Sequence, residues 1–122
     1  MGLDMYAFSV PAGTDLKDED GVVGKQELAY WRKFNALHGW MEQLYHSKGG
    51  NETFNCVAVQ LTEADLDDLE RAIGESTLKP TEGFFFGEQT IYPEDIEATK
   101  EFIADAREQL ADGKDVYYDS WW

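Results

Sequence analysis

Side chains capable of acid–base chemistry or ligand binding lie at helical spacing within the segment YWRKFNALHGWME. The set, hereafter the polar row, runs at intervals of four, three and four residues: Trp31, Asn35, His38 and Glu42. On a helix these intervals place all members on one side. His38 titrates near physiological pH, so it is the candidate acid or base if a substrate oxygen lies within hydrogen-bond reach. Alternatively, His38 and Asn35 bond to backbone groups of neighbouring strands and Trp31 belongs to the core.

The closing segment DVYYDSWW, residues 115–122, has the composition of a strand. Successive side chains of a strand point to opposite faces, so one set comprises Tyr117, Asp119 and Trp121, and the other Tyr118, Ser120 and Trp122. One set is expected in the core and the other exposed or in a site. The predicted ligand-binding residues are therefore Trp31, Asn35, His38, Tyr118 and Trp122.

The rest of the chain predicts the elements that position these residues. Strands are expected over residues 5–10, 56–61, 83–87 and 115–122, and helices over 26–46, 62–74 and 93–111. Thr62 is placed to cap the second helix, with Asp65 near the capping-box position. Pro93 suits the first turn of the third helix, and Gly113 suits its end. We expect the closing strand to dock on the helix carrying Trp31 and Trp40, so deletion of both terminal tryptophans should lower the melting temperature by several degrees.

These elements predict an α+β fold, a single two-layer domain spanning residues 1–122. Its sheet should have about four strands, mixed or antiparallel, with three helices on one face, in the order β-α-β-α-β-α-β.

Other catalytic or metal chemistry has weaker sequence support. A cysteine beside a histidine is typical of a thiol nucleophile, which makes Cys56 and His38 a candidate pair, but Cys56 opens an apolar run and is expected to be a buried, inert thiol. The loop around Gly21 partly matches a calcium loop, with Asp18, Asp20 and Glu27 at ligand positions, yet its first position is Leu16. We therefore expect no metal. No phosphate-binding glycine motif occurs in the sequence, and no cofactor is expected.

The charge of the chain restricts its partners. Of 122 residues, 25 are acidic and 10 basic, giving a net charge of −15. Residues 1–58 contribute −3 and residues 59–122 contribute −12. Such a surface repels nucleic-acid phosphates and anionic membranes and attracts basic proteins. With one cysteine and no signal-peptide pattern, a cytoplasmic location is expected.

Five blocks of the sequence carry a resemblance that covers almost the whole chain: MGLDMY, ELAYWRKFNALHGWMEQLY, FNCVAVQLTEADLDDLE, GFFFGE and VYYDSWW. Together they resemble a family of small proteins of unknown function from bacteria and their phages. The resemblance implies a bacterial or phage origin and a cytoplasmic life, and it brings no activity. Some members are labelled phosphoglycerate kinase, a label that this sequence does not support because it contains no nucleotide-binding element.

Two functions remain in competition. The first is a non-enzymatic interaction or regulatory protein that binds a basic protein partner, with carboxylates that imitate DNA phosphates. The second is a small-molecule-binding domain or minor enzyme with a pocket at the polar row and the closing strand. Aromatic residues also favour interfaces, so a homodimer seam is a further alternative. Catalysis is left open by the sequence, which favours the non-enzymatic role.

Overall fold

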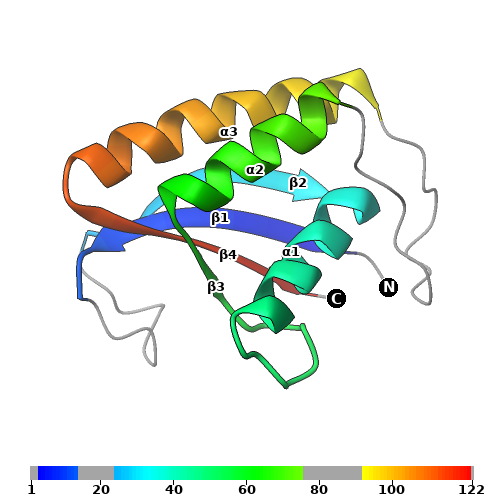
Figure 1. Ribbon diagram of the computed structural model, residues 1–122, viewed down its shortest axis with the longest axis horizontal. Coiled ribbons are helices and arrows are strands. Elements are labelled where there is room, and N and C mark those ends of the chain that lie inside the picture. Colours follow the sequence, from blue (N-terminus) through cyan, green and yellow to red (C-terminus); the bar gives the residue numbers. More distant parts are fainter. Residues whose placement is uncertain (1–2, 14–23, 76–91, 122) are drawn as a thin grey trace.

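Two long strands form the centre of the sheet. In the computed structural model, which describes residues 3–13, 24–75 and 92–121, β1 (Asp4–Pro11) runs antiparallel to β4 (Lys114–Trp121). β2 (Gln26–Arg32) pairs with the free side of β1, and β3 (Val59–Leu61) with that of β4. The order is β2-β1-β4-β3, and every pair is antiparallel (Figure 1).

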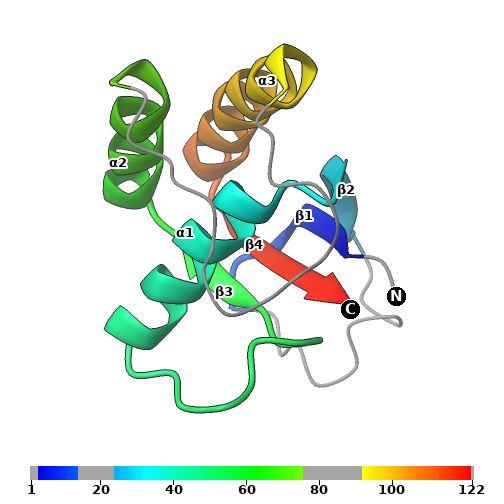
Figure 2. The same cartoon turned by 90° about the vertical axis from the view of Figure 1, so that its right-hand side faces the viewer.

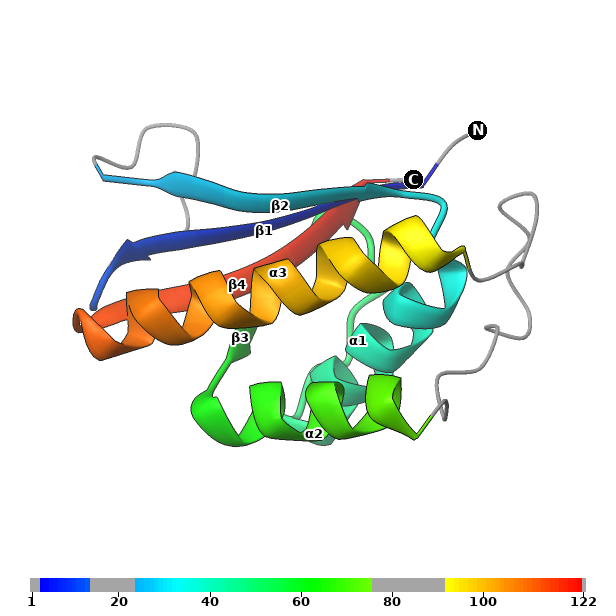
Figure 3. The same ribbon diagram turned by 90° about the horizontal axis from the view of Figure 1, so that it is seen from above.

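Three helices cover one face of this sheet (Figure 2). They are α1 (Asn35–Ser47), α2 (Glu63–Gly74) and α3 (Pro93–Ala111). α3 lies along the sheet over β2, β1 and β4, and α2 packs beside α3 (Figure 3). The predicted α+β class with four strands and three helices is thus confirmed.

The boundaries of α2 and α3 follow from local chemistry as predicted. Thr62 accepts a hydrogen bond from the Asp65 backbone N–H, and the Asp65 carboxylate accepts one from the Thr62 N–H, which completes a capping box. Pro93 occupies the first turn of α3, where its missing N–H costs nothing. After α3, Gly113 adopts a φ of 79°, which glycine tolerates without strain, and the chain turns into β4.

The prediction of one helix over residues 26–46 is wrong in its first part. Residues 26–32 form β2, and the helix begins at Asn35. Lys33 separates the two with a left-handed φ of 57°, and its N–H donates to the Leu3 carbonyl. The spacing of Tyr30 with Phe34 is typical of a helix, but pairing of residues 26–32 with β1 outweighs this local periodicity. The observed order is therefore β-β-α-β-α-α-β.

The prediction of a strand from residue 56 is also wrong at its start. Cys56 has a φ of 59°, incompatible with an extended strand, and β3 begins at Val59. The side chain of Cys56 is exposed, so the expectation of a buried thiol is wrong as well. The predicted strand 83–87, and Asp18 and Asp20 of the calcium-like loop, lie outside the described residues, whereas Glu27 lies exposed in β2.

Alternation along β4 sorts the closing segment as expected. Val116, Tyr118 and Ser120 point to the helices and are buried. Trp121 points the other way and is 65% exposed. The strand is thus built into the fold, but Trp121 is not a core residue, and Trp122 lies outside the described residues. The stability loss expected from deleting both tryptophans therefore gains no support from Trp121.

The core lies between the sheet and the helices. Its largest fully enclosed side chains come from every layer: Trp31, Tyr118, Phe34, Phe54, Phe102, Leu3, Met5, Leu37, Met41, Leu61 and Leu66. Over the described ranges 3–13, 24–75 and 92–121, no helix has both the length and the apolar character needed to cross a membrane.

Candidate functional site

His38 and Tyr118 form the polar centre of the core. His38 lies in the first turn of α1, and Tyr118 lies opposite it in β4. The His38 Nδ1 and Tyr118 Oη atoms share a hydrogen bond of 2.9 Å. The side chains are 1% and 0% exposed. The hydrogen bond therefore satisfies polar atoms that burial would otherwise leave costly.

Aromatic rings enclose this pair. Phe54, from the segment between α1 and β3, stacks on Tyr118 at 5.9 Å and lies 5.2 Å from the His38 ring. Trp31 of β2 lies 6.4 Å from Tyr118 and meets Phe102 of α3 edge-on at 5.4 Å. Three segments distant in sequence thus converge on Tyr118, and α3 joins them through Trp31, so the cluster links the sheet to the helices.

Trp31 is held by a polar contact as well as by packing. Its indole N–H donates to the Thr99 hydroxyl over 3.0 Å, and that hydroxyl donates to the Asp95 carbonyl one turn earlier in α3. Both residues are buried. The hydrogen bond fixes the orientation of the indole between β2 and α3.

Burial determines the protonation state of the two polar groups. The low polarity around His38 lowers the pKa of its imidazole from 6.5 to about 4, because the charged form loses its hydration. Burial raises the pKa of the Tyr118 phenol well above its ordinary value, and the Asp119 and Glu42 carboxylates add to that rise. At neutral pH the cluster therefore holds a neutral imidazole and a neutral phenol.

Most of the predicted ligand-binding residues meet in this cluster. Trp31, His38 and Tyr118 come together, and Asn35 is buried one turn before His38. They do so by a route the sequence did not predict, because Trp31 belongs to a strand and only the other members of the polar row share a helix. Trp122 lies outside the described residues. Since His38 is enclosed, a substrate reaches its ring only if surrounding side chains move.

Sequence reasoning missed two contributors to this cluster. Thr99 lies between Ile96 and Ile103 at helical spacing, so its inward position was detectable from the periodicity of α3. Phe54 lies in a segment without regular structure, and no pattern in the neighbouring sequence predicts that its side chain is buried.

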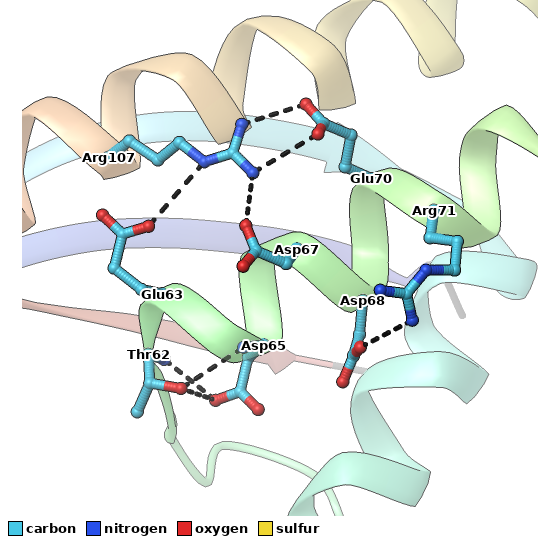
Figure 4. Close-up of polar contacts among 8 residues, drawn as sticks. All are labelled: Thr62, Glu63, Asp65, Asp67, Asp68, Glu70, Arg71 and Arg107. Carbon is cyan, nitrogen blue, oxygen red and sulfur yellow. Dashed lines mark hydrogen bonds and ion pairs between the residues drawn. The ribbon is translucent and has the colours of Figure 1, made fainter.

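One arginine of α3 forms ion pairs with three acidic residues of α2. The Arg107 guanidinium lies 2.7 Å from Asp67, 2.9 Å from Glu70 and 3.9 Å from Glu63 (Figure 4). The hydrogen bonds that Arg107 donates to Glu70 and then to Asp67 raise the pKa of its guanidinium above its usual value. Three carboxylates around one cation leave a local surplus of negative charge on this surface.

A solvent-facing ladder of aromatic and acidic residues lies on the opposite side of the sheet. Tyr6 of β1 pairs across the ladder with Tyr30 of β2 and with Asp119 of β4. The Tyr30 hydroxyl donates to the Asp4 carboxylate over 2.7 Å. Tyr30 is 49% exposed. Near Tyr6 and Tyr30 this side of the sheet, hereafter the outer face, therefore presents rings and carboxylates to solvent, whereas Phe8 and Val10, farther along β1 on the same side, are buried.

Metal-binding and family comparisons add no further assignment. Within the parts of the chain that the structure describes, no group of three or more His, Cys, Asp or Glu is arranged to hold a metal ion. Comparisons of the sequence and structure with known protein families, curated proteins and solved structures find no match.

Proposed function

We propose that the protein is a non-enzymatic binding module for a basic protein partner in the cytoplasm of a bacterium or phage-infected cell. The observation that carries this proposal is the contrast between a neutral, enclosed acid–base pair and a strongly acidic exterior. His38, the candidate catalytic residue, is 1% exposed and hydrogen-bonded to a core tyrosine. These properties support a structural role for the imidazole.

The exterior has the charge needed for such a partner. Exposed carboxylates follow the solvent side of α3, namely Glu94, Glu97, Glu101, Asp105 and Glu108. Lys100 forms an ion pair of 3.7 Å with Glu97 on the same surface, and Arg107 faces α2. A surface with this surplus attracts cationic proteins and accelerates their association, and the attraction weakens as salt screens it.

The small-molecule alternative rests on the same cluster of Trp31, Asn35, His38 and Tyr118. It requires that the cluster open to solvent, because its members are at most 2% exposed. A His38→Asn variant separates the two functions, since binding of a basic protein should survive this change whenever the variant is folded, whereas a pocket built on His38 should lose its ligand.

The experiment is a capture assay with the immobilised protein in bacterial lysate. Bound proteins are eluted at about 0.05, 0.15 and 0.5 M NaCl and identified, with a neutral protein of similar size as the control. We expect the specific fraction to be rich in basic proteins and to be released by the highest salt. A bound set without basic enrichment, or one retained at high salt, would contradict the proposal.

A further inference from the structure

The outer face has a regular arrangement fixed by strand register. Around Asp4 of β1, the neighbours across the ladder are Arg32 of β2 and Trp121 of β4. Two residues farther along β1, on the same face, Tyr6 lies between Tyr30 of β2 and Asp119 of β4. Adjacent strands lie about 4.8 Å apart, so rings and carboxylates alternate within the reach of one extended segment.

Two of the three exposed large hydrophobic residues in the described chain, Tyr30 and Trp121, lie on this face. Tyr30 tilts against Tyr6 with ring centroids 5.3 Å apart. Single exposed apolar residues are common, but a group of aromatic rings on one open face is typical of a contact surface.

The same face already holds cations of the chain itself. Lys25 Nζ lies 4.4 Å from the centre of the Phe8 ring, and Phe8 stacks with Tyr117 at 5.8 Å. Arg32 lies beside Asp4 in the ladder. Phe8 is 1% exposed, so the Lys25 contact lies at the covered end of the face, while Arg32 is a register neighbour of Asp4 at the other end. An aromatic ring and a carboxylate are the two groups that stabilise a bound cation, and both are present on this face.

The electrostatic field at the centre of this face is negative. Burial, followed by the Asp4, Glu27 and Asp119 carboxylates, raises the pKa of the Tyr6 phenol. Three carboxylates from three strands therefore act on one ring. A second copy of this chain would place the same carboxylates against these and carries a net charge of −15 over its whole length, so self-association here is disfavoured.

We infer that the outer face of the sheet, centred on Tyr6, Tyr30 and Trp121 between Asp4 and Asp119, is the docking surface for an arginine-bearing segment of the basic partner. This inference rests on the proposed function and names its surface. A planar guanidinium stacks on an aromatic ring while donating two hydrogen bonds to a carboxylate, which a lysine ammonium cannot reproduce. Between Pro93 and Ala111 the carboxylates of α3 carry charge without exposed rings, and the exposed Tyr92 lies only at the N-cap, so the carboxylates along the helix attract arginine and lysine alike.

The test uses two acetylated and amidated octapeptides, one alternating glycine with arginine and one alternating glycine with lysine. Their dissociation constants are measured by calorimetry at about 0.05 M NaCl. We expect the arginine peptide to bind several-fold more tightly than the lysine peptide. The double variant Tyr30→Ser/Trp121→Ser should weaken arginine-peptide binding at least about fivefold and abolish the preference for arginine.

The matched control is Glu97→Gln/Glu101→Gln, which removes two charges from exposed positions of α3 and leaves the outer face intact. It should weaken both peptides equally, by less than about threefold, through the loss of general attraction. Circular dichroism confirms that each variant is folded. Equal affinity for the two peptides, or an unchanged affinity of the aromatic double variant, would overturn the inference.

The capture assay distinguishes failure of the inference from failure of the proposed function. If basic proteins bind and the aromatic double variant retains them, the outer face is not the docking surface and the proposed function stands. If neither peptide nor any basic protein binds, both fall. A concentration-dependent dimer that Trp121→Ser converts to a monomer would identify a second copy as the occupant and contradict the inference.

Discussion

Stability of the protein should fall as the pH drops from neutral to mildly acidic, because His38 must remain neutral in the folded state. Its pKa is about 4 in the fold against an ordinary value of 6.5. Between these values the unfolded chain binds a proton that the folded chain does not, so acid favours unfolding. The full effect is about 3 kcal/mol, of which about 2 kcal/mol is lost between about pH 7.5 and about pH 5.

Urea unfolding at several pH values measures this loss, with His38→Asn as the test variant. Asparagine keeps a polar atom near the position of Nδ1 for Tyr118 but does not titrate. Carboxylates contribute to the pH dependence of both proteins, so the difference between them isolates His38. His46→Gln is the control, because His46 is the other histidine of the chain and is exposed. Parallel pH curves for wild type and His38→Asn would refute the reasoning.

Three further tests measure how single substitutions change stability. Trp31→Ala should lower the free energy of unfolding by about 3–5 kcal/mol, because it leaves a cavity at a buried site. Trp121→Ala should lower it by less than about 1 kcal/mol, because Trp121 is 65% exposed. Equal losses in urea unfolding would contradict the burial of Trp31. Arg107→Gln should lower the free energy of unfolding by about 1 kcal/mol or less in low salt, because its contacts with carboxylates lie at the surface. The loss should be smaller near 1 M NaCl, where salt screens these contacts. A loss that does not depend on salt would show that packing of the side chain dominates. Gly50→Ala should destabilise the protein by about 1–3 kcal/mol, because a Cβ there overlaps the Tyr45 ring. Gly74→Ala should stabilise it by up to about 1 kcal/mol, because the new Cβ meets open space at the end of α2. The two melting temperatures should therefore move in opposite directions.

The sequence predicted those elements that carry their own boundary signals. The capping box at Thr62 and the proline at the start of α3 state local preferences that the fold preserves. The last eight residues likewise predicted that the side chains of β4 divide between two faces, one in the core, but the sequence left open which set is buried.

The failures occur where a distant strand decides the backbone. Residues 26–32 have helical spacing and enough helix-forming residues to read as a helix, yet they pair with β1. Cys56 opens an apolar run, yet it takes a left-handed conformation while its N–H donates to the Ser120 carbonyl. Neither contact partner is visible from the local sequence.

The candidate site divides in the same way. Helical periodicity correctly placed Asn35, His38 and Glu42 on one side of a helix. Trp31 joins the cluster from β2, so its helical spacing with those residues is coincidental. The outer face could not be predicted, because Tyr6, Tyr30 and Asp119 become neighbours only through the register of three strands.

The most direct test of where a basic partner binds is a nitrogen–proton NMR titration of the full chain with the arginine peptide. We expect the largest shifts at the backbone amides of Tyr6, Tyr30 and Asp119 and at the indole N–H of Trp121, with the indole N–H of buried Trp31 unmoved. Shifts concentrated along α3, or centred on the indole of Trp31 and the ring of His38, would contradict docking on the outer face.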